Sequence, residues 1–474
     1  MQNQHPLPNL FWSFIPIICL VLLLSFNVYV FGDDAIEGSN QFILLIGGSV
    51  AFLVGILFKV PVSSMLAKIS DNIKSITSAM LILLFVGSLA ASWLISGIIP
   101  AMVYYGIQLL SPTYFLPCTV IISALISIAT GSSWTTSATI GISLIAIGKT
   151  MGFPSGMVAG AVISGAYFGD KLSPLSDTTN LASAIAGSTL FNHIRYMLLT
   201  TVPSIVITLL IFTGISLSLE VNQVKGLDSL LLGISESFYI SKWLFLVPLL
   251  VILMIFRKVS PLVALFLGTV LGVIFTFLFQ SAHLSSSYLF NYKYIMDAIT
   301  SGISIQTENS ILNELFRSGG MSGMLGTIWL IICAMVFGGI MESIGALHVI
   351  SKALLYMSRS IFGLFASTLA SCLTINLTAS DQYLAIVVPG KMFKQSYEDS
   401  GLAPENLSRT LEDSGTVTSV LIPWNTCGAY QSGVLGVGVG EYFIYAIFNY
   451  LSPLMSLIVA ATGYKVKRIV KPNR

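Results

Sequence analysis

Eight long apolar runs constrain the fold of this chain more than any other feature of its sequence. Of the 474 residues, 55% are hydrophobic and only 9% are charged, and a helix needs roughly 20 apolar residues to cross a bilayer. A soluble domain could not bury so many runs of this length, so the sequence predicts an all-α polytopic membrane protein. The runs are Phe11–Phe31, Gln41–Phe58, Met80–Leu110, Tyr196–Leu217, Lys242–Phe256, Pro261–Phe279, Met324–Met341 and Tyr442–Gly463.

A polar segment, residues 169–180, lies between two apolar stretches of the chain. It holds Asp170, Lys171 and Asp177 together with four hydroxyl side chains and the helix-breaking Pro174. Ionisable side chains and irregular backbone are costly at membrane depth, and they persist mainly where they line a water-filled path or bind ions. We therefore predict that this segment belongs to a transport site.

Two further regions have the pattern of membrane helices that are interrupted partway. Residues 114–147 are apolar except for the hydroxyl-rich stretch 131–139, and residues 361–388 are apolar except for a polar stretch around Asp381. A polar cluster with two acidic residues follows each region: the segment described above in the first half, and residues 412–416 in the second. Interrupted helices in corresponding positions of two halves are typical of secondary transporters built from inverted repeats.

This pattern predicts four parts and about 10–12 membrane segments. The parts are N-terminal scaffold and dimerisation helices (1–110), a first repeat (111–256), connecting helices (257–343), and a second repeat with the C-terminal helix and basic tail (344–474). The run Met80–Leu110 leaves one question open, because a continuous helix of this length measures about 46 Å against a hydrocarbon core of about 30 Å. Pro100 could break or tilt it, and a second short crossing there would change the relative orientation of the repeats.

Basic residues gather in a few of the loops and in the C-terminal tail, and acidic residues gather in other loops. The basic residues include Lys59, Lys68, Lys74, Arg257, Lys258, Lys465, Lys467, Arg468, Lys471 and Arg474, and the acidic ones include Asp33, Asp34, Glu37 and Glu220. Since loops rich in Lys and Arg stay in the cytoplasm, we predict that both termini are cytoplasmic. The same rule accounts for the basic tail, so no nucleic-acid partner is expected.

Acidic side chains within the apolar regions are candidates for binding a cation or a proton. One carboxylate can hold either, and competition between them would exchange one for the other. Asp170 and Asp177 are the candidates in the first half, and Asp381, Glu412 and Asp413 are their counterparts in the second. Three other interpretations stay open. Lys171 could neutralise a first-half aspartate in a buried ion pair, Glu412 and Asp413 could lie at the edge of a loop, and the hydroxyl-rich stretch could be a helix-packing surface.

The segment Gly169–Thr179 and the stretch Ala129–Trp134 together resemble the NhaC-type sodium/proton antiporters, a family of the ion transporter superfamily. The likeness extends less sharply over residues 119–440, where Asn425–Thr426 resembles the Asn-Thr pair of a hairpin tip. The resemblance implies broken helices and re-entrant hairpins around a site in the middle of the membrane, where sodium is exchanged for protons, and it implies a homodimer. Carriers that exchange malate and lactate with sodium are placed in the same family, so a carboxylate exchanger is the alternative.

On this basis we expect a secondary active transporter, not an enzyme, in the bacterial cytoplasmic (inner) membrane. It would use no cofactor, and its partners would be the lipid bilayer, sodium and protons. Asp170 and Asp177 would bind sodium or protons, with Lys171 as their charge partner. Further site oxygens are expected from Ser133, Thr135, Thr136, Thr178, Asn180, Asp381, Glu412, Asp413, Asn425 and Thr426. A dicarboxylate would favour basic side chains or helix N-termini, and Lys171 is the one basic residue inside the polar clusters.

Overall fold

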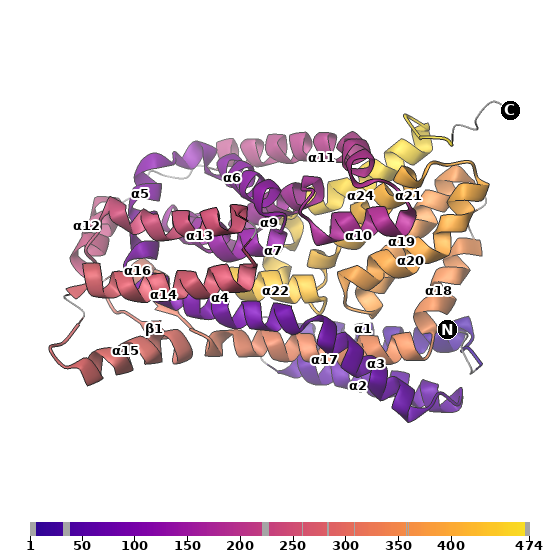
Figure 1. Cartoon of the computed structure of the whole chain (residues 1–474), viewed down its shortest axis with the longest axis horizontal. Helices are drawn as coiled ribbons and strands as arrows, with labels where there is room; N and C mark the ends of the chain where they lie inside the picture. The colour runs from indigo at the N-terminus through magenta and orange to yellow at the C-terminus, as the bar shows by residue number, and fades with distance from the viewer. Residues whose placement is uncertain are drawn as a thin grey trace.

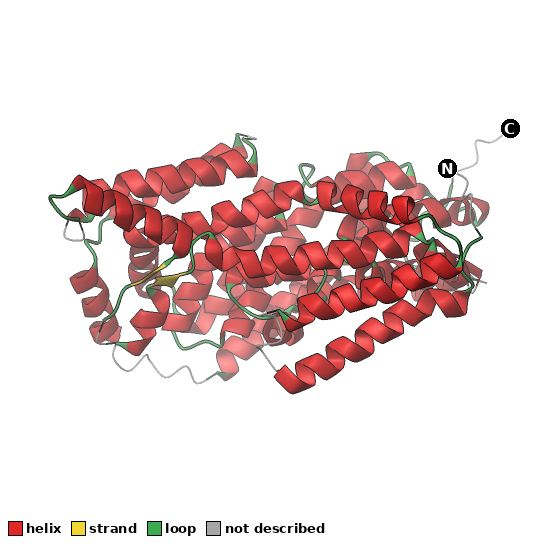
Figure 2. Cartoon of the chain, turned by 90° about the horizontal axis from the view of Figure 1, so that it is seen from below, coloured by secondary structure: helices red, strands yellow, loops and turns green. Residues whose placement is uncertain are grey.

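The computed structural model describes residues 6–31, 38–219, 227–257, 259–281, 284–307, 309–356, 358 and 360–469. Some of the charged residues from which the membrane orientation is predicted lie outside these ranges. They are Asp33, Asp34, Glu37, Glu220, Lys258, Lys471 and Arg474. Within the described ranges the regular structure is helical (Figures 1 and 2), apart from two short strands. These are β1 (Ile303–Ser304) and β2 (Arg317–Ser318), which pair antiparallel with Ile303 opposite Ser318.

Eight of the described helices are long and apolar enough to cross a membrane, and two bent helix pairs raise that number to ten. This confirms the predicted all-α membrane fold, at the lower end of the predicted number of segments. The eight spans are α1 (Leu10–Phe31), α2 (Ser39–Leu57), α4 (Thr77–Ile95), η2 with α6 (Pro112–Thr130), α11 (Leu190–Ser218), α14 (Pro261–Phe279), η6 with α17 (Ser322–Ser343) and α19 (Ile361–Thr378). The bent pairs are α12 (Leu227–Ser237) with η4 and α13 (Lys242–Phe256), and α23 and η9 (Val439–Tyr445) with α24 (Ile447–Thr462).

The remaining helices are shorter or less apolar, and they connect or interrupt these spans. They are α3 (Val62–Ser75), α5 (Ile98–Leu109), α7 (Ser133–Thr136), the π-helical turn η3 (Ser137–Gly141), α8 (Ile142–Thr150), α9 (Ser155–Leu172), α10 (Asp177–Ala186), α15 (Tyr288–Ser301), α16 (Ser310–Leu315), α18 (Ala346–Tyr356), α20 (Gln382–Asp399), α21 (Pro404–Leu411), the π-helical turn η7 (Glu412–Thr416), η8 (Ser419–Leu421) and α22 (Thr426–Leu435).

The long apolar run Met80–Leu110 forms two helices rather than one. Helix α4 ends at Ile95 and α5 begins at Ile98, because Gly97 between them adopts a left-handed conformation with φ 77°. The break therefore comes three residues before Pro100, which sits in the first turn of α5, where a proline costs little because its missing N–H would have no partner. With 12 residues, α5 is shorter than a membrane span.

Helix α11 runs along the length of the molecule and identifies its two ends (Figure 1). Near the C-terminal end of α11, the Ser216 hydroxyl donates to the carbonyl of Pro112, just before α6. Near its N-terminal end, the Tyr196 hydroxyl donates to the carbonyl of Lys465 in the C-terminal segment. We call these the Ser216 end and the Tyr196 end of the molecule.

Two helical hairpins reach the middle of the molecule from opposite ends. In the first, α6 begins at the Ser216 end and α8 returns to that end, where it packs against α16. In the second, α19 and α20 pack side by side, and the chain leaves α20 at the Tyr196 end, where Leu402 pairs with Arg468 of the C-terminal segment. The opposite approach of the two hairpins is the arrangement that inverted repeats require.

Two crossing helices are interrupted between the same ends. Helix α9 starts at the Ser216 end, and after residues 173–176 its direction is continued by α10 toward the Tyr196 end. Helix α21 starts at the Tyr196 end, and η7, η8 and residues 422–425 separate it from α22. These two broken helices therefore traverse the molecule in opposite directions, as the hairpins do.

Helices α6 and α9 pack at very close range because of two glycines. A Cβ atom on Gly165 would lie 2.2 Å from the carbonyl oxygen of Val120, and one on Gly169 would lie 2.5 Å from that of Ala124. Their spacing of four residues places both on one face of α9, and small residues of this kind let membrane helices approach each other. This contact fixes the depth of α9 just before Asp170.

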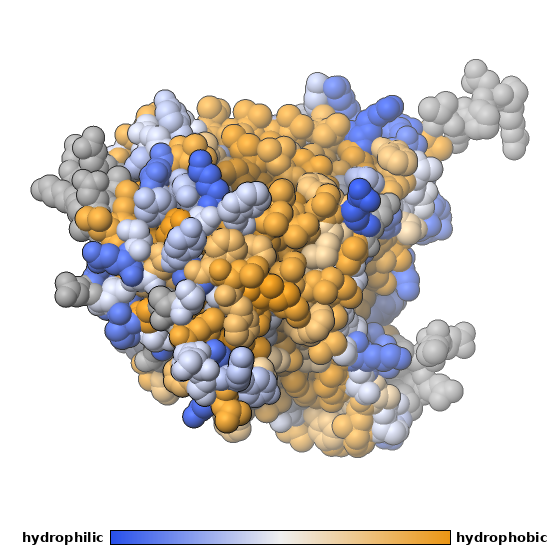
Figure 3. Space-filling view, turned by 60° about the vertical axis from the view of Figure 1, so that its left-hand side comes forward, coloured by the Kyte–Doolittle hydropathy of each residue, from blue (hydrophilic) through white to orange (hydrophobic). Residues whose placement is uncertain are grey.

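The outer surface carries large apolar side chains, as a bilayer requires. Leu210, Leu249 and Leu278 are 66%, 62% and 65% exposed. A space-filling view shows a broad hydrophobic surface with hydrophilic residues toward its sides (Figure 3). The start of α1 and the end of α24 both lie at the Tyr196 end (Figures 1 and 2).

Candidate ion-binding site

Four helices, α7, α10, α20 and α22, begin around one cavity in the middle of the molecule. Each follows an interruption of the chain, and a polar N-cap side chain accepts a hydrogen bond from the first turn. The donors are the backbone N–H of Thr135 to Ser132 (3.2 Å), Thr179 to Ser176 (3.3 Å), Leu384 to Asp381 (2.9 Å) and Cys427 to Asn425 (3.0 Å). Ser, Asp and Asn are preferred caps, which explains why polar residues stand at each interruption.

The cavity has a volume of about 440 Å³, and residues of all four predicted parts of the chain line it. Within the part of the chain that the structure describes, none of the lining residues is basic. The polar and aromatic ones are Ser75, Ser78, Thr130, Ser132, Trp134, Thr135, Asp170, Ser176, Asp177, Thr178, Ser260, Asp381, Gln382, Tyr383, Thr426 and Tyr430. Three carboxyl groups thus face one space without a cationic side chain among them.

Asp170 is held at the cavity by the tip of the first hairpin. Its Oδ2 accepts hydrogen bonds from the backbone N–H of Ser133 at 3.0 Å and from its Oγ at 2.7 Å. The tip itself turns at Gly131, which has φ 70° and lies so close to Leu175 that a Cβ would come within 2.5 Å of that side chain. The first hairpin therefore packs directly on the break between α9 and α10.

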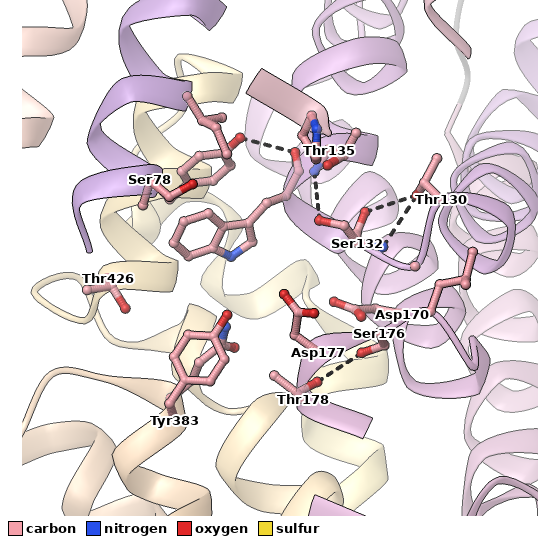
Figure 4. A pocket seen from close by; sticks show the side chains of 18 of the residues that line it. Ser78, Thr130, Ser132, Thr135, Asp170, Ser176, Asp177, Thr178, Tyr383 and Thr426 are labelled. Atoms are coloured by element: carbon pink, nitrogen blue, oxygen red, sulfur yellow. Dashed lines mark hydrogen bonds between the residues drawn. The ribbon is translucent and has the colours of Figure 1, made fainter. Parts of the chain in front are cut away.

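Asp177 is the first residue of α10 and lies beside Asp170 in the cavity (Figure 4). Asp170 is buried, whereas Asp177 is exposed. A negative side chain in the first turn of a helix is stabilised by the helix dipole. Thr178 follows it and is buried, with its hydroxyl 3.1 Å from that of Ser176.

The second half of the chain supplies the opposite wall, where Figure 4 shows Tyr383 and Thr426 across from the two aspartates. Asp381 caps α20 and is 5% exposed. The two interruptions of this half are joined, because the backbone N–H of Thr426 donates to the carbonyl of Ser380 at 2.9 Å. Ser380 has φ 58°, a left-handed conformation that is uncommon for a residue other than glycine.

Lys171, Glu412 and Asp413 lie behind the cavity instead of lining it. All three are fully buried, which excludes the loop-edge interpretation of the two acids. Lys171 forms an ion pair with Asp413, so the buried pair that the sequence left open exists, but with a partner from the other half of the chain. Glu412 and Asp413 begin the π-helical turn η7, and π-helical turns are frequent at functional sites.

Three other predicted residues brace the interruptions and do not line the cavity. The Thr136 hydroxyl donates to the carbonyl of Ser132 at 2.9 Å, and Asn180 donates to the carbonyls of Pro174 and Ser176. Asn425 caps α22 and donates to the carbonyl of Asn376 at 3.1 Å. Of the predicted residues, those that line the cavity are Thr135, Asp170, Asp177, Thr178, Asp381 and Thr426, while Ser133 binds Asp170.

The sequence prediction missed the aromatic part of the site. The rings of Trp134 and Tyr430 stack with centroids 4.0 Å apart and an angle of 17° between their planes, and the Tyr430 hydroxyl donates to the carbonyl of Trp134. These residues are 296 positions apart, so no local pattern could pair them. It also missed Ser78, which α4 contributes from the predicted N-terminal scaffold.

In the described part of the chain, no three His, Cys, Asp or Glu side chains come together closely enough to hold one metal ion. A cation in this cavity would therefore need neutral oxygens beside the carboxylates. The hydroxyls of Thr135, Ser176 and Thr178 are among those available there.

Comparison with known proteins shows extensive similarity. Residues 165–464 match the model of the Na+/H+ antiporter family. The Na(+)/H(+) antiporter NhaC of Alkalihalophilus pseudofirmus is 36% identical over 417 residues, which cover 88% of this chain and 89% of that protein. The Malate-2H(+)/Na(+)-lactate antiporter of Bacillus subtilis is 34% identical over 96% of this chain and 95% of its own length. Among solved structures, MtrF of Neisseria gonorrhoeae aligns over 96% of this chain and 94% of its own, with 14% identity and a TM-score of 0.35.

Proposed function

The chain belongs to the Na+/H+ antiporter family, and we propose that it exchanges sodium for protons through the carboxylates of the central cavity. The observation that carries the proposal is the pair of neighbouring carboxylates, Asp170 and Asp177, in a cavity with no basic side chain among its described lining residues. Carboxyl groups at membrane depth are costly unless they bind ions or protons.

The exchange follows from competition for the same carboxylates. A carboxylate of Asp170 or Asp177 is neutralised either by a proton or by a sodium ion, so binding of one displaces the other. The hydroxyls of Thr135 and Thr178 would complete the sodium coordination, and Asp381 would contribute from the second half of the chain. Hard cations prefer such oxygen ligands.

The four capped helix N-termini would stabilise the empty, charged state of the site. Their dipoles direct partial positive charge toward the cavity, which stabilises carboxylates near the first turn of each helix. The cavity can then hold ionised aspartates although none of its described lining residues is basic.

Sodium-driven dequenching of a pH-sensitive dye in everted vesicles tests this function. We expect Asp170→Asn and Asp177→Asn each to abolish the sodium response, since an amide cannot exchange a proton for a cation. Asp399→Asn is the matched control, because Asp399 is exposed at the C-terminal end of α20, about 27 Å of helix away from the cavity residues at its start. An unaltered sodium response in the two cavity variants would refute the assignment.

A carboxylate exchanger is the second candidate, and the ring of helix N-termini favours it. Half-helix N-termini bind the carboxylates of substrates in other transporters, and one relative is a malate and lactate antiporter. The described lining residues include no basic side chain, which speaks against a dicarboxylate. The same vesicles, tested with malate or lactate and with or without sodium, separate the two functions: a response that requires the organic anion would favour this one.

We also propose that the protein resides in the bacterial cytoplasmic membrane with both termini in the cytoplasm. The start of α1 and the end of α24 lie at the same end of the molecule, which supports one side of the membrane for both termini. The basic residues Lys59, Lys465 and Lys467 support the cytoplasmic side. A homodimer, which the family resemblance implies, stays a prediction that light scattering of the purified protein tests.

A further inference from the structure

Lys171 is completely enclosed and is not among the residues that line the cavity. Its side chain is 0% exposed, and its Nζ donates to Oδ1 of Asp413 and to the Ser452 hydroxyl at 2.8 Å. The ring of Phe448 lies 5.6 Å from the same nitrogen. An ammonium group is expensive to bury unless it is paired and hydrogen-bonded, and here it has both kinds of partner.

Asp413 is anchored from several elements at once. Oδ1 accepts a hydrogen bond from Ser452 at 2.8 Å and Oδ2 one from Ser456 at 2.9 Å, both on α24. The guanidinium of Arg409 on α21 lies 3.8 Å from Oδ2. Through Asp413, Lys171 is therefore tied to α21, η7 and α24 in the second half of the chain.

Arg409 is itself fully buried and packs against aromatic rings of two other helices. Its guanidinium group lies 4.7 Å from the ring of Tyr196 and 5.7 Å from that of Phe365. Aromatic faces attract a desolvated guanidinium. Side chains of α11 and α19 therefore pack against the guanidinium group of Arg409, which lies near Asp413.

Asp170 and Lys171 are neighbours at the end of α9, and they point to different places. Successive side chains on a helix are turned by about 100°, and here Asp170 reaches the cavity while Lys171 reaches the buried anchor. The last turn of α9 is therefore held by two interactions: the hydrogen bond from Ser133 of the first hairpin to Asp170, and the ion pair of Lys171 with Asp413. A shift of α21 and η7 relative to α9 would turn the carboxylate of Asp170.

We propose that Lys171 is a positioning residue for the ion site: its ion pair with Asp413 links the second half of the chain to the orientation of Asp170. This inference rests on the proposed sodium/proton exchange. Lys171 touches neither the cavity nor its ion, and it acts through the residue beside it. The pair joins the two halves where α9 and α21 both cease to be regular α-helices, at Leu172 and Leu411.

The test must separate positioning from folding. Removing Lys171 alone would leave Asp413 buried without its ion-pair partner, which is strongly destabilising. The double variant Lys171→Met with Asp413→Asn removes one positive and one negative charge, so the net charge of the buried cluster is kept. The introduced amide can accept a hydrogen bond from one serine hydroxyl and donate one to the other. Arg409 loses the carboxylate 3.8 Å away and keeps its contacts with the rings of Tyr196 and Phe365. A second variant, Lys171→Arg, keeps the positive charge and changes its geometry, because a guanidinium is a planar fork and an ammonium a point charge.

Sodium-driven exchange in proteoliposomes is measured as KM and maximal rate for each variant that elutes as a folded monodisperse protein. We expect KM for sodium to rise roughly tenfold, within the range of coupling between linked sites, with the maximal rate changed much less. The control is Lys68→Met with Glu342→Gln, an ion pair of 2.8 Å between α3 and α17 that is partly exposed, and its KM should match the wild type.

The possible results of this experiment distinguish failure of the positioning role from failure of the proposed function. A folded double variant or Lys171→Arg variant with the wild-type KM overturns the positioning role, because a structural ion pair alone would leave KM unchanged. A wild-type protein that moves no protons in response to sodium refutes the proposed function, and with it this inference. A raised KM in both Lys171 variants, with a normal control, supports it.

Discussion

Asp170 takes its orientation from Ser133, which lies 37 residues earlier in the chain. The serine gives two hydrogen bonds to the same carboxylate oxygen, one from its backbone and one from its side chain. At the scale of single residues the site is therefore built from pairs that connect one interruption to another. Lys171 with Asp413 and Thr426 with Ser380 follow the same rule.

We expect Ser133→Ala to raise the KM for sodium about tenfold, equivalent to about 1.4 kcal/mol, and to leave the fold intact. The variant loses a hydrogen bond to a charged group, which is worth about 1.5–3 kcal/mol, but it keeps the backbone N–H donor, so the carboxylate is less firmly oriented and still present. Dye dequenching over a series of sodium concentrations measures the effect. Ser204→Ala is the control, since that buried hydroxyl bonds only within α11, and equal KM values in both variants would contradict the role of Ser133.

At the scale of elements, the interruptions of the helices are specified locally. Ser132, Ser176, Asp381 and Asn425 each cap the helix that follows, so the same polar residues that end one segment start the next. The interruption predicted at 131–139 is confined to Gly131 and Ser132, because Ser133–Gly141 is helical. Residues 173–176 separate α9 from α10, and residues 379–381 separate α19 from α20, where the sequence predicts a break around Asp381. The close contact of α6 and α9 holds the first of these breaks against the second.

We expect Gly165→Ala to destabilise the protein by about 1–3 kcal/mol, the usual cost of overpacking a core. The added methyl group would lie 2.2 Å from the Val120 carbonyl oxygen, so α6 and α9 must separate. Thermal unfolding followed by size-exclusion chromatography measures the change.

Gly214→Ala is the matched control for this prediction, because Gly214 lies inside α11 with nothing within 4 Å of the added atom. Alanine there should be neutral or stabilise the protein by up to about 1 kcal/mol. If both alanine variants unfold at the same temperature, the close packing of α6 and α9 does not limit stability.

At the scale of the whole molecule, two hairpins and two broken helices from opposite ends meet at one cavity. This arrangement places a polar cavity in the middle of the molecule, while the face seen in Figure 3 carries a broad hydrophobic surface. It also brings the start of α1 and the end of α24 to one end of the bundle. Because these two helix ends lie at the same end of the bundle, finding on which side of the membrane the C-terminus lies would orient the whole protein.

We expect green fluorescent protein fused after Arg474 to fluoresce in bacterial cells and alkaline phosphatase fused there to be inactive, since the basic tail predicts a cytoplasmic C-terminus. Fluorescence and phosphatase activity of the two fusions are measured side by side. An active phosphatase fusion with a dark fluorescent one would reverse the proposed orientation and place both ends outside.

The amino-acid sequence alone specifies the membrane class, the places where helices break and the polar residues at those breaks, because hydrophobic length, caps and glycines act within a few neighbouring residues. Which acids face the cavity depends on the folded structure. The regular rotation of about 100° per residue is lost at each break and in π-helical turns, so it does not relate the side-chain directions of Asp170, Asp381 and Asp413 to one another. The sequence therefore could not distinguish the two cavity aspartates from Asp413. The partner of Lys171 lies 242 residues away, and the ring that stacks on Trp134 lies 296 away. Contacts over such separations arise from the packing of the two halves against each other, which no local pattern encodes.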